Sequence, residues 1–189
     1  MSQRNVVVDE DDRLLDAARA CVLAVGVRRT TVTDVARRAG VSRMTLYRRF
    51  PDLEGVLSAL MTREFGRLVA GAADSAEGSN TRERLVATVV HGSRALAEDP
   101  LFERLLDVDP ELLLPYVTQR LGGMQKMAVA ASARLLADAD DSVRDDAPPE
   151  VLAAGMELIA RGFVLASHGE IGLDPWAELA RAIDGYLRP

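Results

Sequence analysis

The chain has few of the residues on which covalent and metal chemistry depends. Its 189 residues include one cysteine, Cys21, and two histidines, His91 and His168. A lone cysteine excludes an internal disulfide framework and a thiolate zinc cluster, and two histidines leave little for a metal site or a histidine-based nucleophilic dyad. No catalytic triad, paired catalytic carboxylates or phosphate-binding loop stands out. We therefore expect no enzyme, no cofactor and no metal.

Long hydrophobic runs are also missing. None approaches the roughly 18 residues that a membrane-spanning helix requires, and the opening MSQRNVVVDEDD lacks the basic start and apolar middle of a secretory signal. We expect a soluble, cytoplasmic protein. Aromatic residues make up only 4% of the chain and strand signals are scarce, whereas alanine, leucine and arginine, which favour helix, are abundant. The sequence predicts an all-α protein of about nine helices.

The charge is divided unevenly along the chain, which has a net charge of -6. Residues 13–50 carry nine arginines against Asp16 and Asp34, a balance of +7. Residues 51–189 carry 13 basic and 23 acidic residues, a balance of -10. A basic end on an acidic body can hold a polyanion at that end alone. An ordinary solvated surface can have the same composition. Charge by itself therefore does not show whether this end binds a polyanion.

The basic end has the helix signals of a DNA-binding motif. A helix over about 11–25 ends at Gly26, a second follows the N-cap Thr31 and stops at Gly40, and a third follows the N-cap Ser42 and ends before Pro51. A fourth runs over about 53–72. Two short helices joined by a tight turn at a glycine make a helix-turn-helix, whose second helix enters the DNA major groove.

Residues of the third helix suit DNA contact. An arginine can donate two hydrogen bonds to a guanine edge, and a threonine offers a hydroxyl and a methyl group. Helix N-termini present free N–H groups to phosphate. A helical hairpin with a solvated basic face is the alternative. The candidates on this basis are Thr31, Ser42, Arg43, Met44, Thr45, Tyr47 and Arg48.

The stretch TTVTDVARRAGVSRMTLYRRFPDLEGVLSALM resembles the DNA-binding region of the tetracycline-repressor (TetR) family of bacterial transcriptional regulators. The likeness covers roughly residues 10–65 without a gap. It implies an N-terminal three-helix DNA-binding domain and a larger helical C-terminal domain that dimerises and usually binds a small-molecule inducer. We therefore expect an arm at 1–9, a DNA-binding domain at 10–52, a connecting helix at 53–72 and a regulatory and dimerisation domain at 73–189.

The resemblance also implies residue roles. Tyr47 stands where the family has a phosphate-binding tyrosine, and Arg43, Met44 and Thr45 stand where base-contacting residues usually lie. The chain has Leu53 where many members have a lysine near the fourth helix start. We expect Arg28 or Arg29 to supply that charge. The second helix start often touches the DNA backbone, and positions 48 and 49 vary within the family; these add Thr33 and Arg49 to the candidates.

The body is predicted to hold helices over about 81–97, 116–138, 148–168 and 174–187, with short pieces after Asp99 and Asp109. The helix at 148–168 is apolar nearly all round and must be buried on every side. One face can meet its own domain, while the other needs a partner, although an ordinary monomer core fits the same periodicity. The resemblance favours a homodimer through Val151, Leu152, Gly155, Ile159, Gly162, Phe163, Trp176, Ala180, Ile183 and Leu187.

A ligand pocket would lie among the C-terminal helices, and methionines there favour a mostly apolar effector. The candidate lining is His91, Phe102, Leu105, Leu106, Tyr116, Met124, Met127 and Phe163, each of which also fits a plain core position. We expect a repressor that binds a pseudo-palindromic operator in double-stranded DNA and is released by a small-molecule effector. The alternative is a ligand-independent DNA-binding regulator controlled by a protein partner or by abundance.

Overall fold

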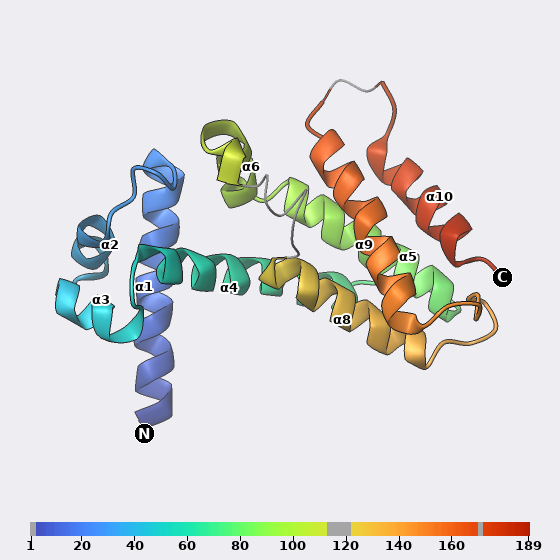
Figure 1. Ribbon diagram of the computed structural model, residues 1–189, viewed down its shortest axis with the longest axis horizontal. Coiled ribbons are helices and arrows are strands. Elements are labelled where there is room, and N and C mark those ends of the chain that lie inside the picture. Colours follow the sequence, from blue (N-terminus) through green and yellow to red (C-terminus); the bar gives the residue numbers. More distant parts are fainter. Residues whose placement is uncertain (1–2, 113–121, 170–171) are drawn as a thin grey trace. The chain divides into compact units, whose positions relative to one another are not determined.

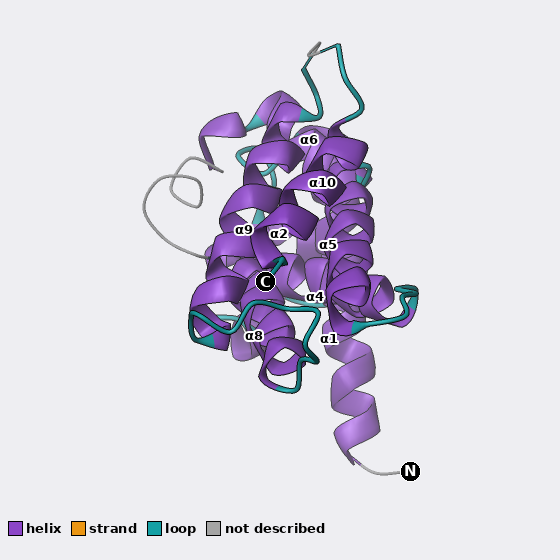
Figure 2. Cartoon of the chain, turned by 90° about the vertical axis from the view of Figure 1, so that its right-hand side faces the viewer, coloured by secondary structure: helices purple, strands orange, loops and turns teal. Residues whose placement is uncertain are grey.

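The computed structural model describes residues 3–112, 122–169 and 172–189, and within these ranges every regular element is a helix (Figure 2). The all-α prediction is therefore confirmed. The helices are α1 (Gln3–Val25), α2 (Val32–Ala39), α3 (Arg43–Arg49), α4 (Leu53–Asp74), α5 (Thr81–Ala97), α6 (Pro100–Val108), the short 3-10 helix η1 (Pro110–Leu112), α8 (Gly123–Ala137), α9 (Pro149–Ala166) and α10 (Pro175–Leu187).

The chain divides into two compact units. The first contains α1, α2, α3, the part of α4 up to Glu64, and then α6 with η1. The second contains the rest of α4 from Phe65, with α5, α8, α9 and α10. The contacts thus assign α6 and η1 to the N-terminal unit, whereas the predicted division at residue 73 had them in the C-terminal domain.

The first unit is built around an apolar core to which several helices contribute. Leu14 of α1, Val35 of α2, Leu46 of α3 and Leu60 of α4 are fully buried there. In Figure 1, α2 and α3 lie to one side of α1. Burial of apolar side chains on one face of each short helix supplies the stability that helices of eight and seven residues lack in isolation.

Most helix ends agree with the sequence-based expectation, but the start of α1 does not. The sequence predicts that this helix begins near residue 11, after an arm at 1–9. In the structure α1 begins at Gln3. Acidic residues favour a helix start without enforcing one, and no proline or glycine precedes Asp9 to interrupt the helix. The predicted part of the helix at 116–121 lies outside the described residues.

The second unit is a helical bundle in which α9 packs against α5, α8 and α10 (Figure 1). Its core includes Leu85 of α5, Met156 of α9 and Leu179 and Ile183 of α10, all at most 1% exposed. Three neighbouring helices of the same chain therefore cover much of the apolar surface of α9, which explains most of its all-round apolar sequence without a partner. No helix in the described ranges is both long and apolar enough to span a bilayer.

Candidate nucleic-acid interface

The start and end of α2 are fixed by local hydrogen bonds. The Thr31 hydroxyl oxygen accepts a hydrogen bond from the backbone N–H of Asp34 at 3.1 Å and donates one to the Asp34 carboxylate at 2.6 Å. At the other end Gly40 takes a left-handed φ of 69°, and the N–H of Val41 reaches back to the carbonyl of Ala36 at 3.0 Å. This C-terminal motif needs glycine, because side chains rarely tolerate that φ.

Helix α3 begins and ends as the sequence predicts. The Ser42 hydroxyl oxygen accepts from the N–H of Thr45 at 3.0 Å, and the N–H of Phe50 donates to the carbonyl of Leu46 at 2.9 Å before Pro51. Met44 and Leu46 are the two aliphatic side chains of α3 that could anchor it in the core. Leu46 is fully buried and Met44 is 77% exposed, so Leu46 is the anchor and Met44 faces outward.

The outer face of α3 carries the side chains expected to contact DNA. Arg43, Met44, Tyr47 and Arg48 are exposed, and Thr45 is half-buried. A surface depression is lined by Ser42, Met44, Thr45, Tyr47 and Arg48. In the part of the chain that the structure describes, neither Arg43 nor Arg48 makes a hydrogen bond or an ion pair. Their charges are therefore available to a polyanion. We call the outer face of α3, residues 42–48, the reading face.

Two other candidates are held by carboxylates of their own chain. Arg49 pairs with Glu10 at 2.8 Å and with Asp11 at 3.5 Å. Its hydrogen bond keeps the pKa of Glu10 below the ordinary value. Arg28 pairs with Glu111 at 2.6 Å and lies 3.9 Å from Asp109. Both arginines thus pair within their own chain, whereas Thr31 and Thr33 at the start of α2 are exposed.

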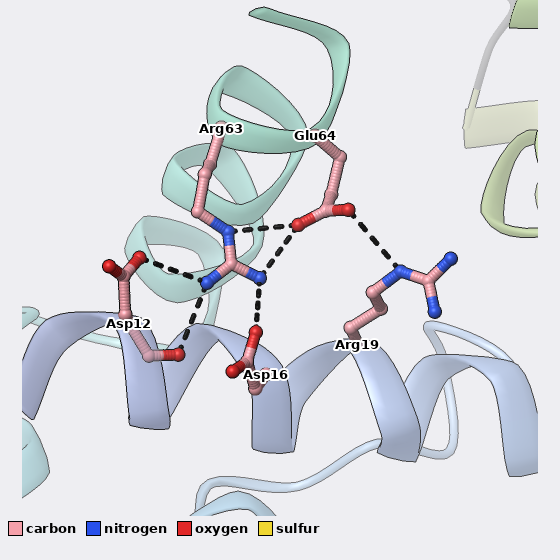
Figure 3. A network of polar contacts seen from close by, with 5 residues as sticks. All are labelled: Asp12, Asp16, Arg19, Arg63 and Glu64. Atoms are coloured by element: carbon pink, nitrogen blue, oxygen red, sulfur yellow. Dashed lines mark hydrogen bonds and ion pairs between the residues drawn. The ribbon is translucent and has the colours of Figure 1, made fainter. Parts of the chain in front are cut away.

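A polar network joins α1 to α4 (Figure 3). Arg63 of α4 donates to the Asp12 carboxylate at 3.1 Å, to Asp16 at 2.8 Å and, through Nε, to Glu64 at 2.8 Å. Glu64 also pairs with Arg19 at 3.3 Å. The sequence-based candidates omitted this network. Its signal was the spacing of Asp12 and Asp16, which puts both carboxylates on one helix face in need of a cation.

Comparisons with known proteins point to one family. Residues 14–60 match the model of the bacterial regulatory proteins of the tetR family. An HTH-type transcriptional regulator of Mycobacterium bovis is 34% identical over 193 residues, which cover 99% of each chain. The chain belongs to the TetR family.

Two solved structures have the same fold as this TetR-family chain. The transcriptional repressor QsdR of R. erythropolis is 20% identical, with 94% of each chain covered and a TM-score of 0.71. SmeT, solved as a complex with triclosan, is 23% identical, with 94% of this chain and 90% of that chain covered and a TM-score of 0.62. The family model and the relative of 34% identity, and not these structures, show that the protein is a DNA-binding transcriptional regulator. Regulators of this family bind operators and ligands as dimers.

The residues predicted to form the dimer interface lie in two different environments. Leu152, Ile183 and Leu187 are buried in the second unit, so they are core residues unavailable to a partner. Gly155 is covered by the Tyr186 ring, because a Cβ there would lie 2.1 Å from the tyrosine oxygen. Val151 and Gly162 are exposed, and Ile159, Phe163, Trp176 and Ala180 are half-buried. Leu158 of α9, which is outside the predicted set, is 61% exposed.

The predicted pocket residues are also divided. Phe102, Leu105 and Leu106 lie on α6 in the first unit, whereas Met124, Met127 and Phe163 lie in the second. Tyr116 lies outside the described residues. His91 of α5 is exposed, so it is not the buried polar group expected in a pocket wall. Helical periodicity could not separate these cases, because it does not show against which helices α6 packs.

Proposed function

We propose that this chain is a transcriptional repressor that binds a pseudo-palindromic operator as a homodimer and is released by a small-molecule effector. The observation that carries the proposal is the reading face. Its arginines are exposed and make no ion pair with any residue that the structure describes, and its backbone is held by the Ser42 cap and the Leu46 anchor. A preformed basic helix face suits the major groove, where arginine reads guanine.

Roles for individual side chains follow from their positions on α3. Arg43 and Met44 stand at its first turn, where a helix entering a groove meets base edges. An exposed methionine suits the methyl group of thymine, which offers an apolar contact. Tyr47 and Arg48 lie one turn further along and suit phosphate oxygens. We assign base reading to the first pair and backbone contact to the second.

The homodimer is proposed to form through the exposed side of α9. Val151, Leu158 and Gly162 recur along α9 at a spacing of seven and four, which places them on one face. Val151 is 55% exposed, and no atom of the described residues is found within 4 Å of a Cβ built on Gly162. A second copy of α9 can therefore approach closely. A two-fold axis there would present two reading faces to operator halves about 34–36 Å apart.

Release by an effector rests on likeness to relatives. A solved neighbour of this fold holds triclosan, and Met124, Met127 and Phe163 are half-buried in the second unit. Methionine adapts to varied apolar shapes, so we propose a mostly apolar effector. Thermal-shift measurements across a panel of apolar metabolites test this step. If no compound shifts the melting temperature or releases DNA, the ligand-independent alternative replaces it.

Selection from a random pool of duplexes is the experiment that tests DNA reading. The purified protein should enrich a pseudo-palindromic site, and its affinity should fall steeply with salt because several phosphates are contacted. Arg43→Ala should lower discrimination at one base pair of each half-site by about 10-fold, since one bidentate arginine contact has that order of effect. Enrichment of no sequence, or full discrimination by Arg43→Ala, would contradict the proposal.

A further inference from the structure

Asp109 is a buried carboxylate that lies far from the reading face in sequence. It follows the last residue of α6, is 2% exposed, and its N–H continues the helix by donating to the carbonyl of Leu105 at 3.0 Å. Its Oδ2 accepts a hydrogen bond of 2.7 Å from the backbone N–H of Val27, 82 positions earlier in the chain. The turn between α1 and α2 is thus tied to the end of α6.

The turn is closed tightly around this contact. Gly26 has a φ of 83°, and a Cβ there would lie 2.8 Å from both the Asp109 carboxylate and the Val108 side chain. Thr30 is 2% exposed, and its hydroxyl donates to the carbonyl of Gly26 at 2.8 Å while its N–H donates to that of Val27 at 3.1 Å. Glycine alone combines this φ with this close approach.

The turn leads directly into α2, because Thr30 precedes the N-cap Thr31. We therefore expect a displacement of Val27 to shift the first turn of α2, which is joined to α3 by the Gly40 motif. Arg28 lies on the outside of the same turn, where Glu111 holds it at 2.6 Å. Asp109 thus binds the backbone of the turn, and Glu111 of η1 pairs with the exposed Arg28 side chain of the same turn.

We propose that Asp109 is a positioning residue for DNA binding: its carboxylate oxygen holds the α1–α2 turn, and through it α2 and α3, in the arrangement that meets DNA. The position of α6 then affects operator affinity through Asp109, the α1–α2 turn and α2. This connection does not pass through α4. The inference rests on the DNA binding proposed for α2 and α3. Asp109 itself contacts no DNA.

Three substitutions in the full chain separate its possible roles. Asp109→Asn keeps an acceptor oxygen for Val27 and removes the charge. Asp109→Glu keeps the charge and moves the acceptor by one methylene. Asp109→Ala removes both. Operator affinity should fall about 10-fold for Asp109→Ala and Asp109→Glu, because a buried N–H then lacks its acceptor, and by no more than about 2-fold for Asp109→Asn.

Glu111→Gln is the matched control, since it weakens only the exposed pair with Arg28 and should change operator affinity by less than about 2-fold. The slope of affinity against salt should be the same in all variants, because the phosphate contacts are unchanged. Amide hydrogen exchange should be faster at Val27 in Asp109→Glu and Asp109→Ala and near the wild-type rate in Asp109→Asn.

Two results would overturn the inference. One is operator binding by Asp109→Glu that matches the wild type while Asp109→Asn is weak, since the charge and not the acceptor position would then matter. The other is equal loss in Asp109→Asn and Asp109→Glu. The comparison of these two variants stands even if Asp109→Ala does not fold. Failure of the wild-type chain itself to bind a selected duplex would instead count against the proposed function.

Discussion

The reading face and the contact of α1 with α4 are both rich in arginine, but they use it differently. On the reading face Arg43 and Arg48 are exposed and without ion pairs among the described residues. Between α1 and α4, the Arg63 side chain is 12% exposed and bonds to Asp12, Asp16 and Glu64 (Figure 3). Arg49, at the end of α3, belongs with the second group because Glu10 holds it.

The difference shows that the supply of carboxylates decides what each arginine does. Arg49 and Arg63 pair with carboxylates of α1 and so join α3 and α4 to that helix, whereas Arg43 and Arg48 make no ion pair among the described residues. An exposed ion pair adds little stability, whereas a part-buried network whose cation is removed leaves unpaired carboxylates. Substitutions of arginines from the two groups test whether they differ in this way.

The largest effect is expected for Arg63→Ala. It removes the cation shared by three carboxylates, and the Glu64 side chain is only 11% exposed. We expect the free energy of unfolding to fall by about 2 kcal/mol, below the full value for a buried pair because Asp12 and Asp16 are partly solvated. Urea denaturation measures it. Arg48→Ala should change stability by less than about 0.5 kcal/mol. Equal stability of the two variants would contradict the distinction between arginines that are paired with carboxylates and arginines that are not.

A smaller effect is expected when the operator binding of Arg48→Ala is compared with that of Arg49→Ala. These neighbours differ in whether a carboxylate holds them. Arg48→Ala should weaken operator binding by about 5-fold and lower the slope of log affinity against log salt by about 1, because one phosphate contact is lost. Arg49→Ala should leave the slope unchanged. Titrations over a range of salt concentrations measure both. A reduced slope for Arg49→Ala would show that Arg49 leaves Glu10 to contact phosphate.

The smallest expected effect is a pH dependence of stability, which tests whether Arg49 is paired with Glu10. The hydrogen bond from Arg49 lowers the pKa of Glu10 from 4.5 in the folded chain. A lowered folded pKa stabilises the fold above the unfolded value, and this contribution is lost as pH falls through the folded pKa. The stability difference between the wild type and Glu10→Gln should hold from about pH 7 to about pH 5 and shrink below the unfolded pKa.

The same substitution in an Arg49→Ala background is the control for this pH effect. Once the arginine is gone, Glu10→Gln should change stability little at any pH, because Glu10 has lost the partner that shifts its titration. Denaturation curves collected at several pH values for the four chains complete the double-mutant cycle. A difference that persists unchanged in the Arg49→Ala background would assign the stabilisation by Glu10 to another neighbour.

Local signals were sufficient for the helix-turn-helix. Thr31, Gly40, Ser42 and Pro51 act on backbone groups within a few residues of themselves, so the bounds of α2 and α3 were readable from the chain. The exposed residues of α3 were predicted for the same reason. The pairing of Arg28 with Glu111 and of Arg49 with Glu10 could not be predicted, because these partners are distant in sequence.

The apolar surface of α9 was harder to interpret. Its composition predicted burial on every side, but not by which helices, and Leu152 was assigned to a partner although its own chain buries it. The division of the predicted pocket between two units has the same origin. Apolar periodicity specifies that a face is covered and does not identify the covering surface.

By itself, the sequence determined the all-helical class, the bounds of the short DNA-binding helices and the reading face, because capping, turn chemistry and periodicity act over one or two helical turns. Tertiary structure alone decided that α6 belongs with the N-terminal helices, that Asp109 reaches Val27, and which arginines are held by carboxylates. These contacts join residues tens of positions apart, and their energies depend on distances and burial that only the folded chain specifies.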